Sequence, residues 1–441
     1  MIQWIETTPA AAFAAKMPTR TAPGPHTLTL DGQKGQTLRG FGGCFNELGW
    51  TALQKACPAD RAAVLNALFG PEGLGLSFNR IPIGASDYAA GWYSCDETPG
   101  DKALEHFTLA RDEEMLIPYI RAAQAVQPDM RFFASPWSPP TWMKQPPVYN
   151  YGRLRREPEI LDAYARYLQT FVAQYAARGI PIDQLHVQNE PFADQKFPSC
   201  LWDAEDFRVF IRDYLGPQLE KAGASTEIFL GTLNGPEEMK LFGYGNVELC
   251  NYNRYLDTIL FDEAARRYIK GIGYQWAGRA VVERTRESFP ELELIQTENE
   301  CGEGKNSWGY AQYMFGLMRH YFRHGVTAYT YWNMVLASGG ESSWGWHQNS
   351  LFTVAPDTGR VTANPEFYVM KHFARFVKPG ARVLGVAGHW SSAAAAFENP
   401  DGSRILVVQN ALARPETFTF ADGDKPFSAV LAPDSFNTFV L

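Results

Sequence analysis

Two glutamates stand at the ends of apolar runs, each in a short polar motif. Glu190 lies in QNEP and Glu298 lies in TENE. A pair of carboxyl groups can hydrolyse a glycosidic bond, because one carboxylic acid protonates the leaving oxygen while the other carboxylate attacks the sugar or activates water. The two groups lie about 5–5.5 Å apart in enzymes that retain the anomeric configuration. We therefore take Glu190 and Glu298 as the candidate catalytic pair.

Position alone does not separate Glu298 from Glu300, two residues further on. Residues 298 and 300 share a face of an extended strand, so either carboxylate could point into the same site. Glu300 then has a second interpretation, as a carboxylate at the rim of the site or one that supports the reacting group.

Aromatic residues are frequent and many stand beside polar residues in turn-rich segments. They make up 14% of the chain, with 12 Trp and 20 Tyr. Sugars present apolar C–H faces that can stack on rings, although most aromatic residues in proteins pack in cores. Trp344 and Trp346 lie in ESSWGWHQNS, which is too polar for a core segment. Asn189, directly before Glu190, is suited to bind the sugar 2-hydroxyl, a contact that strengthens in the transition state.

These residues need a fold in which many strand ends converge. Short apolar runs alternate with helical patterns such as residues 160–179, whose apolar side chains recur at helical spacing. The eight strand-like runs are 38–45, 76–84, 131–137, 185–191, 227–233, 271–276, 292–300 and 328–336. This alternation predicts an α/β fold, a (β/α)8 TIM barrel, in which functional residues follow the C-terminal ends of the strands.

Both ends of the chain have a different pattern. Residues 27–37 alternate around a turn signal, and residues 380–441 contain several short β-type runs. We predict that the two ends pair into a small all-β side domain. The expected boundaries are 1–37 for the N-terminal contribution, 38–375 for the barrel and 376–441 for the C-terminal part of the side domain.

Composition and charge exclude several classes of protein. Of the 441 residues 45% are hydrophobic and 20% charged, which argues against disorder. The net charge of −8 and the lack of a Lys/Arg cluster argue against a nucleic-acid partner. No apolar run reaches the roughly 18 residues of a membrane span. The N-terminal segment has no basic region followed by an apolar core, so we expect a cytoplasmic location unless a leader has been removed.

The cysteines do not form a recognisable framework. They are Cys44, Cys57, Cys95, Cys200, Cys250 and Cys301. Their wide spacing and the absence of CxxC favour reduced, structural thiols over a disulfide scaffold or a zinc site, with a Cys57–Cys95 pair left open. The eight histidines do not cluster at strand ends, which disfavours a metal-dependent hydrolase, and no complete dinucleotide or phosphate-loop motif occurs. We expect no metal and no cofactor.

Several segments, taken together and in order, resemble the glucosylceramidase-type glycoside hydrolases of family 30. They are GFGGCFNELGW (40–50), RIPIGASDY (80–88), FFASPWSPPTWMK (132–144), QNEP with FPSC (188–200), LIQTENECG (294–302) and YWNM (331–334). The match spans most of the barrel, and the β-type ends resemble the side domain of that family.

The resemblance implies a role for each matched residue. It makes Glu190 the general acid/base and Glu298, rather than Glu300, the nucleophile of a retaining mechanism. The residues expected to bind substrate are Arg80, Asp87, Trp137, Asn189, Tyr274, Trp332 and Trp346. Arg80 has a structural alternative, an ion pair that holds Glu298 ionised. The sixth run departs from the family, since it reads Tyr274-Gln275-Trp276 where glucosylceramidase has a His-Trp sequence.

The resulting hypothesis is a retaining β-glycosidase that acts on a carbohydrate substrate without a cofactor. Aromatic and acidic residues near the rim favour a closed pocket and exo action of the β-glucosidase type. The alternatives left open are an endo-acting β-1,6-glucanase or galactanase, a β-xylosidase or β-fucosidase, and a barrel that binds carbohydrate without catalysis. The sequence does not determine the glycone or the oligomeric state.

Overall fold

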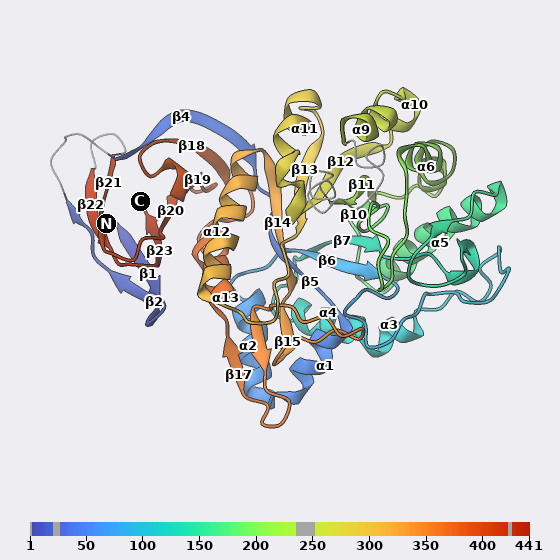
Figure 1. The fold of residues 1–441 in the computed structure, drawn as a ribbon, viewed down its shortest axis with the longest axis horizontal. Helices are drawn as coiled ribbons and strands as arrows, with labels where there is room; N and C mark the ends of the chain where they lie inside the picture. Colours follow the sequence, from blue (N-terminus) through green and yellow to red (C-terminus); the bar gives the residue numbers. More distant parts are fainter. Residues whose placement is uncertain (1, 21–26, 235–251, 422–425) are drawn as a thin grey trace.

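A computed structural model describes residues 2–20, 27–234, 252–421 and 426–441. Within these ranges the chain forms a barrel surrounded by helices and, beside it, a domain made only of β-strands (Figure 1). Both chain ends lie in the β-domain (Figure 1). The predicted fold class is therefore confirmed.

The barrel is closed by eight parallel strands, each lying within a predicted run or beginning one or two residues before it. In chain order they are β5 (Gly40–Cys44), β6 (Phe78–Ile83), β7 (Arg131–Pro136), β10 (Gln184–His186), β11 (Glu227–Leu233), β12 (Ile269–Gln275), β13 (Glu293–Glu298) and β14 (Val326–Asn333). Strand β14 pairs with β5 and closes the ring. All eight strands therefore direct their C-terminal ends to one mouth.

Helices cover the outside of the barrel, and their apolar faces are buried against it. They are α1 (Glu47–Lys55), α2 (Pro58–Phe69), α3 (Ala110–Glu114), α4 (Leu116–Gln124), α5 (Pro158–Ala177), α6 (Ala204–Phe210), α7 (Gly216–Lys221), α9 (Tyr252–Leu260), α10 (Glu263–Arg266), α11 (Val282–Ser288), α12 (Trp308–Arg323) and α13 (Pro365–Ala374). A π-helical turn, Ile211–Leu215, joins α6 to α7. In α5, residues such as Leu161, Tyr164, Leu168 and Phe171 are buried at the spacing that the sequence predicted.

The fourth barrel strand is shorter than predicted. Residues 185–191 were expected to be extended, but β10 ends at His186. Asn189 forms only an isolated bridge with Thr232, and Glu190 adopts a φ of 46°, in the left-handed region. A non-glycine residue in that region is strained and often marks a functional position. The strand therefore ends early and gives way to an irregular segment at the mouth.

An apolar layer fills the barrel below its mouth. Phe78, Phe133, Phe229, Ile295 and Ala328 pack together from five different strands. The rings of Phe78 and Phe133 are stacked with their centroids 5.4 Å apart. This layer closes the barrel interior, so that polar side chains above it face only the mouth.

The side domain is a ten-stranded sheet that contains strands from both chain ends. Its order is β2 (Ala11–Lys16), β1 (Gln3–Thr8), β23 (Ser435–Val440), β20 (Arg404–Asn410), β19 (Ala394–Glu398), β18 (Arg382–Gly388), β4 (Leu28–Thr37), β21 (Glu416–Ala421), β22 (Phe427–Leu431) and β3 (Thr19–Arg20). Its own core includes Leu406, Phe418, Phe427 and Phe439. Phe397 on β19 packs edge-on against Phe322 of α12, which attaches this domain to the barrel.

Short elements shape the loops at the mouth. A three-stranded sheet, β15 (Val335–Ala337), β16 (Phe352–Val354) and β17 (Val361–Ala363), follows β14, and a two-stranded one, β8 (Lys144–Gln145) and β9 (Arg153–Leu154), follows β7. The 3-10 turns are Thr141–Met143, Trp276–Ala280 and Ser391–Ala393.

The cysteines in the described ranges are free, including Cys57 and Cys95, so that pair is not formed; Cys250 lies outside those ranges. Among the described helices, none combines the length and apolar character of a membrane span.

Candidate active site

A pocket of about 280 Å³ opens at the C-terminal ends of the barrel strands. Both candidate carboxylates line it, Glu190 after β10 and Glu298 at the end of β13. Asp87, Trp137, Asn189 and Trp346 also line it. The structure thus brings together residues that lie more than 250 positions apart in the chain.

A bulge in β13 points Glu298 into the pocket. Gln296 pairs with Tyr274 of β12, but the next pair joins Glu298 to Gln275, so β13 contains one extra residue there. An extra residue reverses the alternation of side chains. Ile295 and Glu298 therefore both face the barrel interior, although they are three positions apart and would point to opposite faces of a regular strand. Glu300 comes after the strand has ended and also lines the pocket, half-buried.

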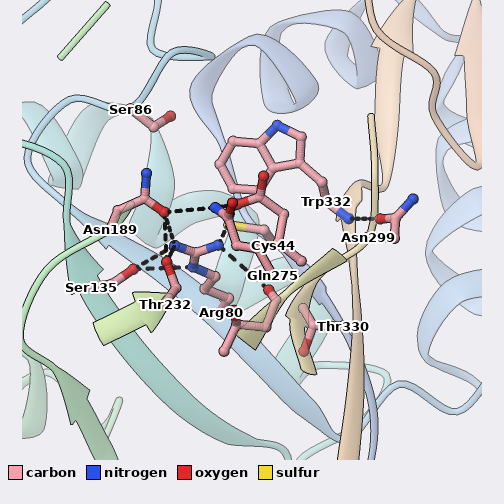
Figure 2. Close-up of polar contacts among 12 residues, drawn as sticks. Cys44, Arg80, Ser86, Ser135, Asn189, Thr232, Gln275, Asn299, Thr330 and Trp332 are labelled. Carbon is pink, nitrogen blue, oxygen red and sulfur yellow. Dashed lines mark hydrogen bonds and ion pairs between the residues drawn. The ribbon is translucent and has the colours of Figure 1, made fainter. Parts of the chain in front are cut away.

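Arg80 is completely buried below the pocket and binds Glu298 directly. Its Nη1 lies 2.6 Å from Glu298 Oε2. Its Nη2 donates to Asn189 Oδ1 at 2.7 Å and to Ser135 Oγ at 2.8 Å (Figure 2). The guanidinium carbon lies 4.4 Å from the centre of the Trp137 ring. Arg80 therefore takes the structural role that the sequence left open, because it is not exposed in the pocket and instead fixes the groups that are.

The environment of Glu190 keeps its carboxyl protonated at neutral pH. Burial and the nearby negative charge of Glu298 raise the pKa of Glu190 to about 8, while Gln275 and Arg80 act in the opposite direction. No arginine or lysine among the described residues forms an ion pair with Glu190. A protonated carboxylic acid at the mouth can donate its proton to a leaving oxygen.

Glu298 is held differently. Burial raises its pKa, but Arg80 opposes that rise through its charge and its hydrogen bond, as do hydrogen bonds from Cys301 and Gln275. Gln275 Nε2 donates to Glu298 Oε2 at 3.1 Å, and the Cys301 thiol lies 3.8 Å from Glu298 Oε1. These donors stabilise the ionised form, which is the form that can act as a nucleophile.

Asn189 presents its amide group to the pocket. Its Oδ1 accepts from Arg80, from Thr232 Oγ1 at 2.8 Å and from Gln275 Nε2 at 3.2 Å. These three donors fix which end of the amide is the oxygen, so the NH2 group points away from Arg80 (Figure 2). That NH2 group can donate a hydrogen bond to a sugar hydroxyl.

Asp87 adds a second polar group to the lining of the pocket. Its Oδ2 lies 3.5 Å from Gln348 Nε2, and its Oδ1 is buried without a hydrogen-bond partner among the described residues. Burial and the negative charges of Glu298 and Glu190 raise the pKa of Asp87. A buried carboxyl oxygen without a partner is costly, so a bound hydroxyl group would stabilise it.

The aromatic residues divide between the wall of the pocket and its rim. Trp137 lines the pocket, and Trp332 stacks behind it with ring centroids 5.2 Å apart, so Trp332 supports the wall without lining it. At the rim, Trp344 packs against Phe197 and Trp346, and Trp346 remains 42% exposed. A partly exposed ring beside a sugar pocket can stack on a further sugar unit.

The structure places Tyr274, which the sequence predicts to bind substrate, outside the lining of the pocket. Strand β12 turns the small Gly271 and Gly273 toward the interior, because a Cβ on Gly273 would lie 2.6 Å from the ring of His186. Tyr274 therefore faces outward, where its hydroxyl donates to Thr285 of α11 at 2.7 Å. Gln275 and Trp276 are the residues of this segment that line the pocket.

The sequence analysis missed several residues that complete the site. Glu298 accepts a hydrogen bond from Gln275, and Arg80 donates to Thr232 and Ser135. The pocket wall also includes Gln348 and Cys301. Strict alternation from Gly271 and Gly273 would have assigned Gln275 to the interior. No local signal marks Gln348, because a long loop after β14 brings it to Asp87.

No group of three or more His, Cys, Asp or Glu residues in the described ranges is arranged to hold a metal ion. His186 lies completely buried below the mouth, where its Nδ1 contacts Gly231 O at 2.7 Å and burial lowers its pKa to about 3.

Comparison with known families matches both parts of the chain. The glycosyl hydrolase family 30 TIM-barrel domain matches residues 38–377, and the β-sandwich domain of the same family matches residues 380–439. The chain is 30% identical to putative glucosylceramidase 2 of Caenorhabditis elegans, over 87% of this chain and 76% of the relative. It is 27% identical to the lysosomal acid glucosylceramidase of Mus musculus, over 94% of this chain and 83% of the relative.

Two solved structures are similar over the full length of this chain. SrfJ from Salmonella typhimurium superposes with a TM-score of 0.89 at 26% identity and is covered to 99%. An endo-β1,6-glucanase superposes with a TM-score of 0.86, also at 26% identity, and is covered to 98%.

Proposed function

The chain belongs to glycosyl hydrolase family 30 and is a glycoside hydrolase, and we propose that it cleaves β-glucosides with retention of configuration, Glu298 acting as nucleophile and Glu190 as acid/base. The unequal environment of these two carboxyl groups carries the proposal. Glu298 accepts hydrogen bonds from a fully buried arginine, whereas burial keeps the pKa of Glu190 near 8. Two carboxyl groups with different protonation states in one pocket are what a two-step displacement requires.

In the first step Glu298 attacks the anomeric carbon and the bond from that carbon to the leaving oxygen breaks. Glu190 transfers its proton to that oxygen, so the aglycone leaves as a neutral alcohol and a glycosyl ester forms on Glu298. In the second step Glu190, now ionised, takes a proton from water, and the resulting nucleophile attacks the same carbon. The ester bond to Glu298 breaks, and Glu190 is again protonated.

The named relatives and the pocket support glucose as the sugar that is bound. The named relatives are glucosylceramidases, and a structural neighbour is an endo-β1,6-glucanase. Both names describe enzymes that act on glucosides. The Asn189 amide and the unpartnered Asp87 oxygen supply a donor and an acceptor for sugar hydroxyls in one pocket. A pocket of about 280 Å³ suits a single terminal sugar, so we propose exo action.

One observation favours a second candidate, an endo-acting β-1,6-glucanase. The exposed ring of Trp346 stands at the rim of the pocket, beyond the position of the sugar that is cleaved. An exposed rim tryptophan is useful to an enzyme that binds several sugar units in succession. The similarity to the endo-β1,6-glucanase structure over this whole chain supports the same candidate.

Initial rates on 4-nitrophenyl β-glucoside, β-xyloside, β-fucoside and β-galactoside, measured beside Glu298→Ala, test the proposal. We expect rapid release from the glucoside, with a loss of at least about 10³-fold in Glu298→Ala. Glu300→Ala is the matched control and should keep most of the activity. Full activity in Glu298→Ala would exclude Glu298 as the nucleophile.

The products from a β-1,6-linked glucan separate the two candidates. Glucose alone from the earliest time points indicates exo action, whereas a ladder of oligosaccharides indicates endo action. Proton NMR of the first product reports the anomer, and α-glucose as the initial product would contradict the retaining mechanism.

A further inference from the structure

A second cavity, of about 330 Å³, lies between the barrel and the side domain. Helices α11 and α12 of the barrel form one wall, and β4, β18 and β19 of the side domain form the other. Figure 1 shows these elements side by side, with α12 next to the β-domain. The cavity is separate from the catalytic pocket, with which it shares no lining residue.

The lining of this cavity is strongly positive. Lys34, Arg286, Arg319 and Arg323 line it, against one carboxylate, Asp31. Lys34 is neutralised by Glu398, whose Oε1 lies 2.6 Å from the ammonium nitrogen. Asp31 uses its Oδ1 to accept from the backbone N–H of Gln33 at 2.8 Å. The three arginines therefore outnumber this one carboxylate, and the cavity lining keeps a net positive charge.

Within the described residues these three arginines have no carboxylate partner. Arg286 Nη1 donates to the backbone oxygen of Arg323 and Arg319 Nη1 to that of Ser391, both at 3.3 Å. The Nε of Arg319 is buried and has no hydrogen-bond partner. The pKa of Arg319 is lowered by burial and by the positive charge of Arg323, so the two side chains repel each other.

This arrangement differs from that of other arginines in the molecule. Arg39 pairs with Glu293 at 2.5 Å and Arg111 with Glu47 at 2.7 Å. A guanidinium group carries five donors in a planar fork that fits carboxylate and phosphate oxygens. Three such groups beside a cavity, with a buried donor unused, are suited to bind an anion together.

The backbone leaves room for one of these side chains. Gly325, in the turn after α12, has a φ of 95°, and a Cβ at this position would lie 2.7 Å from Cδ of Arg286. The Arg286 side chain therefore lies across the turn against a glycine, and the turn keeps the arginine next to Arg323. A cavity acceptor is also unused, because Oε1 of Gln36 is buried without a partner among the described residues.

We propose that the cavity between barrel and side domain binds a phosphate group, with Arg286, Arg319 and Arg323 as its ligands. A tetrahedral anion can accept from several guanidinium groups at once. The cavity has room for more than a phosphate ion, so the natural ligand is a phosphate ester. The Gln36 oxygen can then accept from a hydroxyl of the ester. Because both domains line the cavity, the bound anion stabilises their interface.

Binding of inorganic phosphate to the intact protein tests this proposal. Isothermal titration calorimetry and the melting temperature are measured at constant ionic strength, with chloride as the comparison anion. We expect saturable binding of phosphate and a melting temperature that rises with its concentration. In Arg319→Gln and Arg323→Gln the affinity should fall by about tenfold or more. Arg360→Gln removes one exposed charge outside the cavity and should bind as the unchanged protein does.

A second arm distinguishes a soluble phosphate from a lipid headgroup. Vesicles of phosphatidylcholine, with and without phosphatidic acid, are sedimented with the protein and each variant. Retention that needs phosphatidic acid and is lost in Arg319→Gln assigns the phosphate to a lipid. Saturable binding of free phosphate without retention assigns it to a soluble ester. If neither probe binds, if chloride acts equally, or if the arginine variants bind unchanged, the proposal is overturned.

Discussion

Two cavities in this molecule are lined or supported by arginine, and they treat its charge in opposite ways. At the mouth of the barrel, the single buried Arg80 is surrounded by acceptors and its charge is matched by Glu298. In the cavity between barrel and side domain, three arginines stand together without a carboxylate partner in the described part of the chain.

This difference indicates what each cavity does. A completely buried arginine is stable only with its partners, so Arg80 must hold Glu298 and Asn189 in fixed positions before any substrate arrives. Partly exposed arginines can remain unpaired, because water screens their repulsion, and they gain a partner only when an anion enters. The first arrangement suits catalysis and the second suits binding.

Among the variants beyond Glu298→Ala, removing the acid at the mouth should have the largest effect on turnover. We expect Glu190→Ala to lose about 10²- to 10⁴-fold in kcat with a leaving group of high pKa, because general acid catalysis is gone. The loss should be smaller with an activated aryl leaving group, and added azide should restore turnover as a β-glycosyl azide. An unchanged rate with both substrates would show that the acid lies elsewhere.

The pH dependence of kcat/KM in the unsubstituted enzyme tests the roles of Glu190 and Glu298 together. Glu190 must be protonated in the first step, and its pKa is about 8, so kcat/KM should fall as the pH rises through that value. Glu298 must be ionised, so kcat/KM should also fall at acid pH. In Glu190→Gln the alkaline limb should disappear, and its persistence would assign that limb to another group.

Removing the positive charge of Arg80, which pairs with Glu298, should reduce both the stability of the fold and the activity. In Arg80→Met, Glu298 is left buried without its cation, and we expect a loss of about 3–5 kcal/mol in the free energy of unfolding. Because Arg80 lowers the pKa of Glu298, the acid limb of kcat/KM should move to higher pH. Urea unfolding and the pH profile measure these two effects. Arg39→Met, at the other end of the barrel, should destabilise the protein without moving the acid limb.

Two adjacent residues of β12 have different surroundings: Gln275 lines the pocket, and Tyr274 contacts helix α11 outside the barrel. Gln275→Ala removes the amide that donates to Glu298 and Asn189, so we expect a loss of about tenfold in kcat/KM. Tyr274→Phe removes an outward hydrogen bond to Thr285 and should cost about 1 kcal/mol in the free energy of unfolding, with activity unchanged. A loss of activity in Tyr274→Phe, with unchanged kcat/KM in Gln275→Ala, would show that Tyr274 acts in the site and Gln275 does not.

The smallest predicted effect concerns the arginines of the cavity between barrel and side domain, which have no carboxylate partner among the described residues. Arg319→Gln removes one of the mutually repelling arginines and, without ligand, should raise the free energy of unfolding by about 0.5 kcal/mol at low salt. The gain should vanish at high salt because mobile ions screen the repulsion. Destabilisation by Arg319→Gln at low salt would show that Arg319 has a structural role, as Arg80 does.

Much of the fold could be predicted because local patterns repeat. Eight apolar runs separated by helical patterns have few ways to bury their surfaces, and the closed barrel follows. The length of β10 could not be predicted in this way. The motif QNEP directly follows the apolar residues of the strand in sequence, but Glu190 adopts a left-handed conformation that no local rule assigns to glutamate.

Some features of the candidate site could also be predicted from the sequence, and others could not. The residue types and their places at strand ends were enough to select Glu190 and to narrow the second carboxylate to Glu298 or Glu300, between which the family resemblance favoured Glu298. Their alternation was not enough to place Tyr274, because the direction of β12 depends on which residues fit against the ring of His186. The choice between Glu298 and Glu300 likewise rests on the bulge in β13 and on the ion pair with Arg80, which are properties of neighbouring strands.

The sequence by itself determined the eightfold strand–helix pattern, the β-rich ends and the carboxylates that the chemistry needs, because these depend on residue types and short-range periodicity. Only the tertiary structure decided how charges were matched. It brought Arg80 to Glu298 across 218 positions and left Arg286, Arg319 and Arg323 facing a wall from another domain. The free energy of a charge depends on its burial and its partners, and both are set by segments that are distant in the chain.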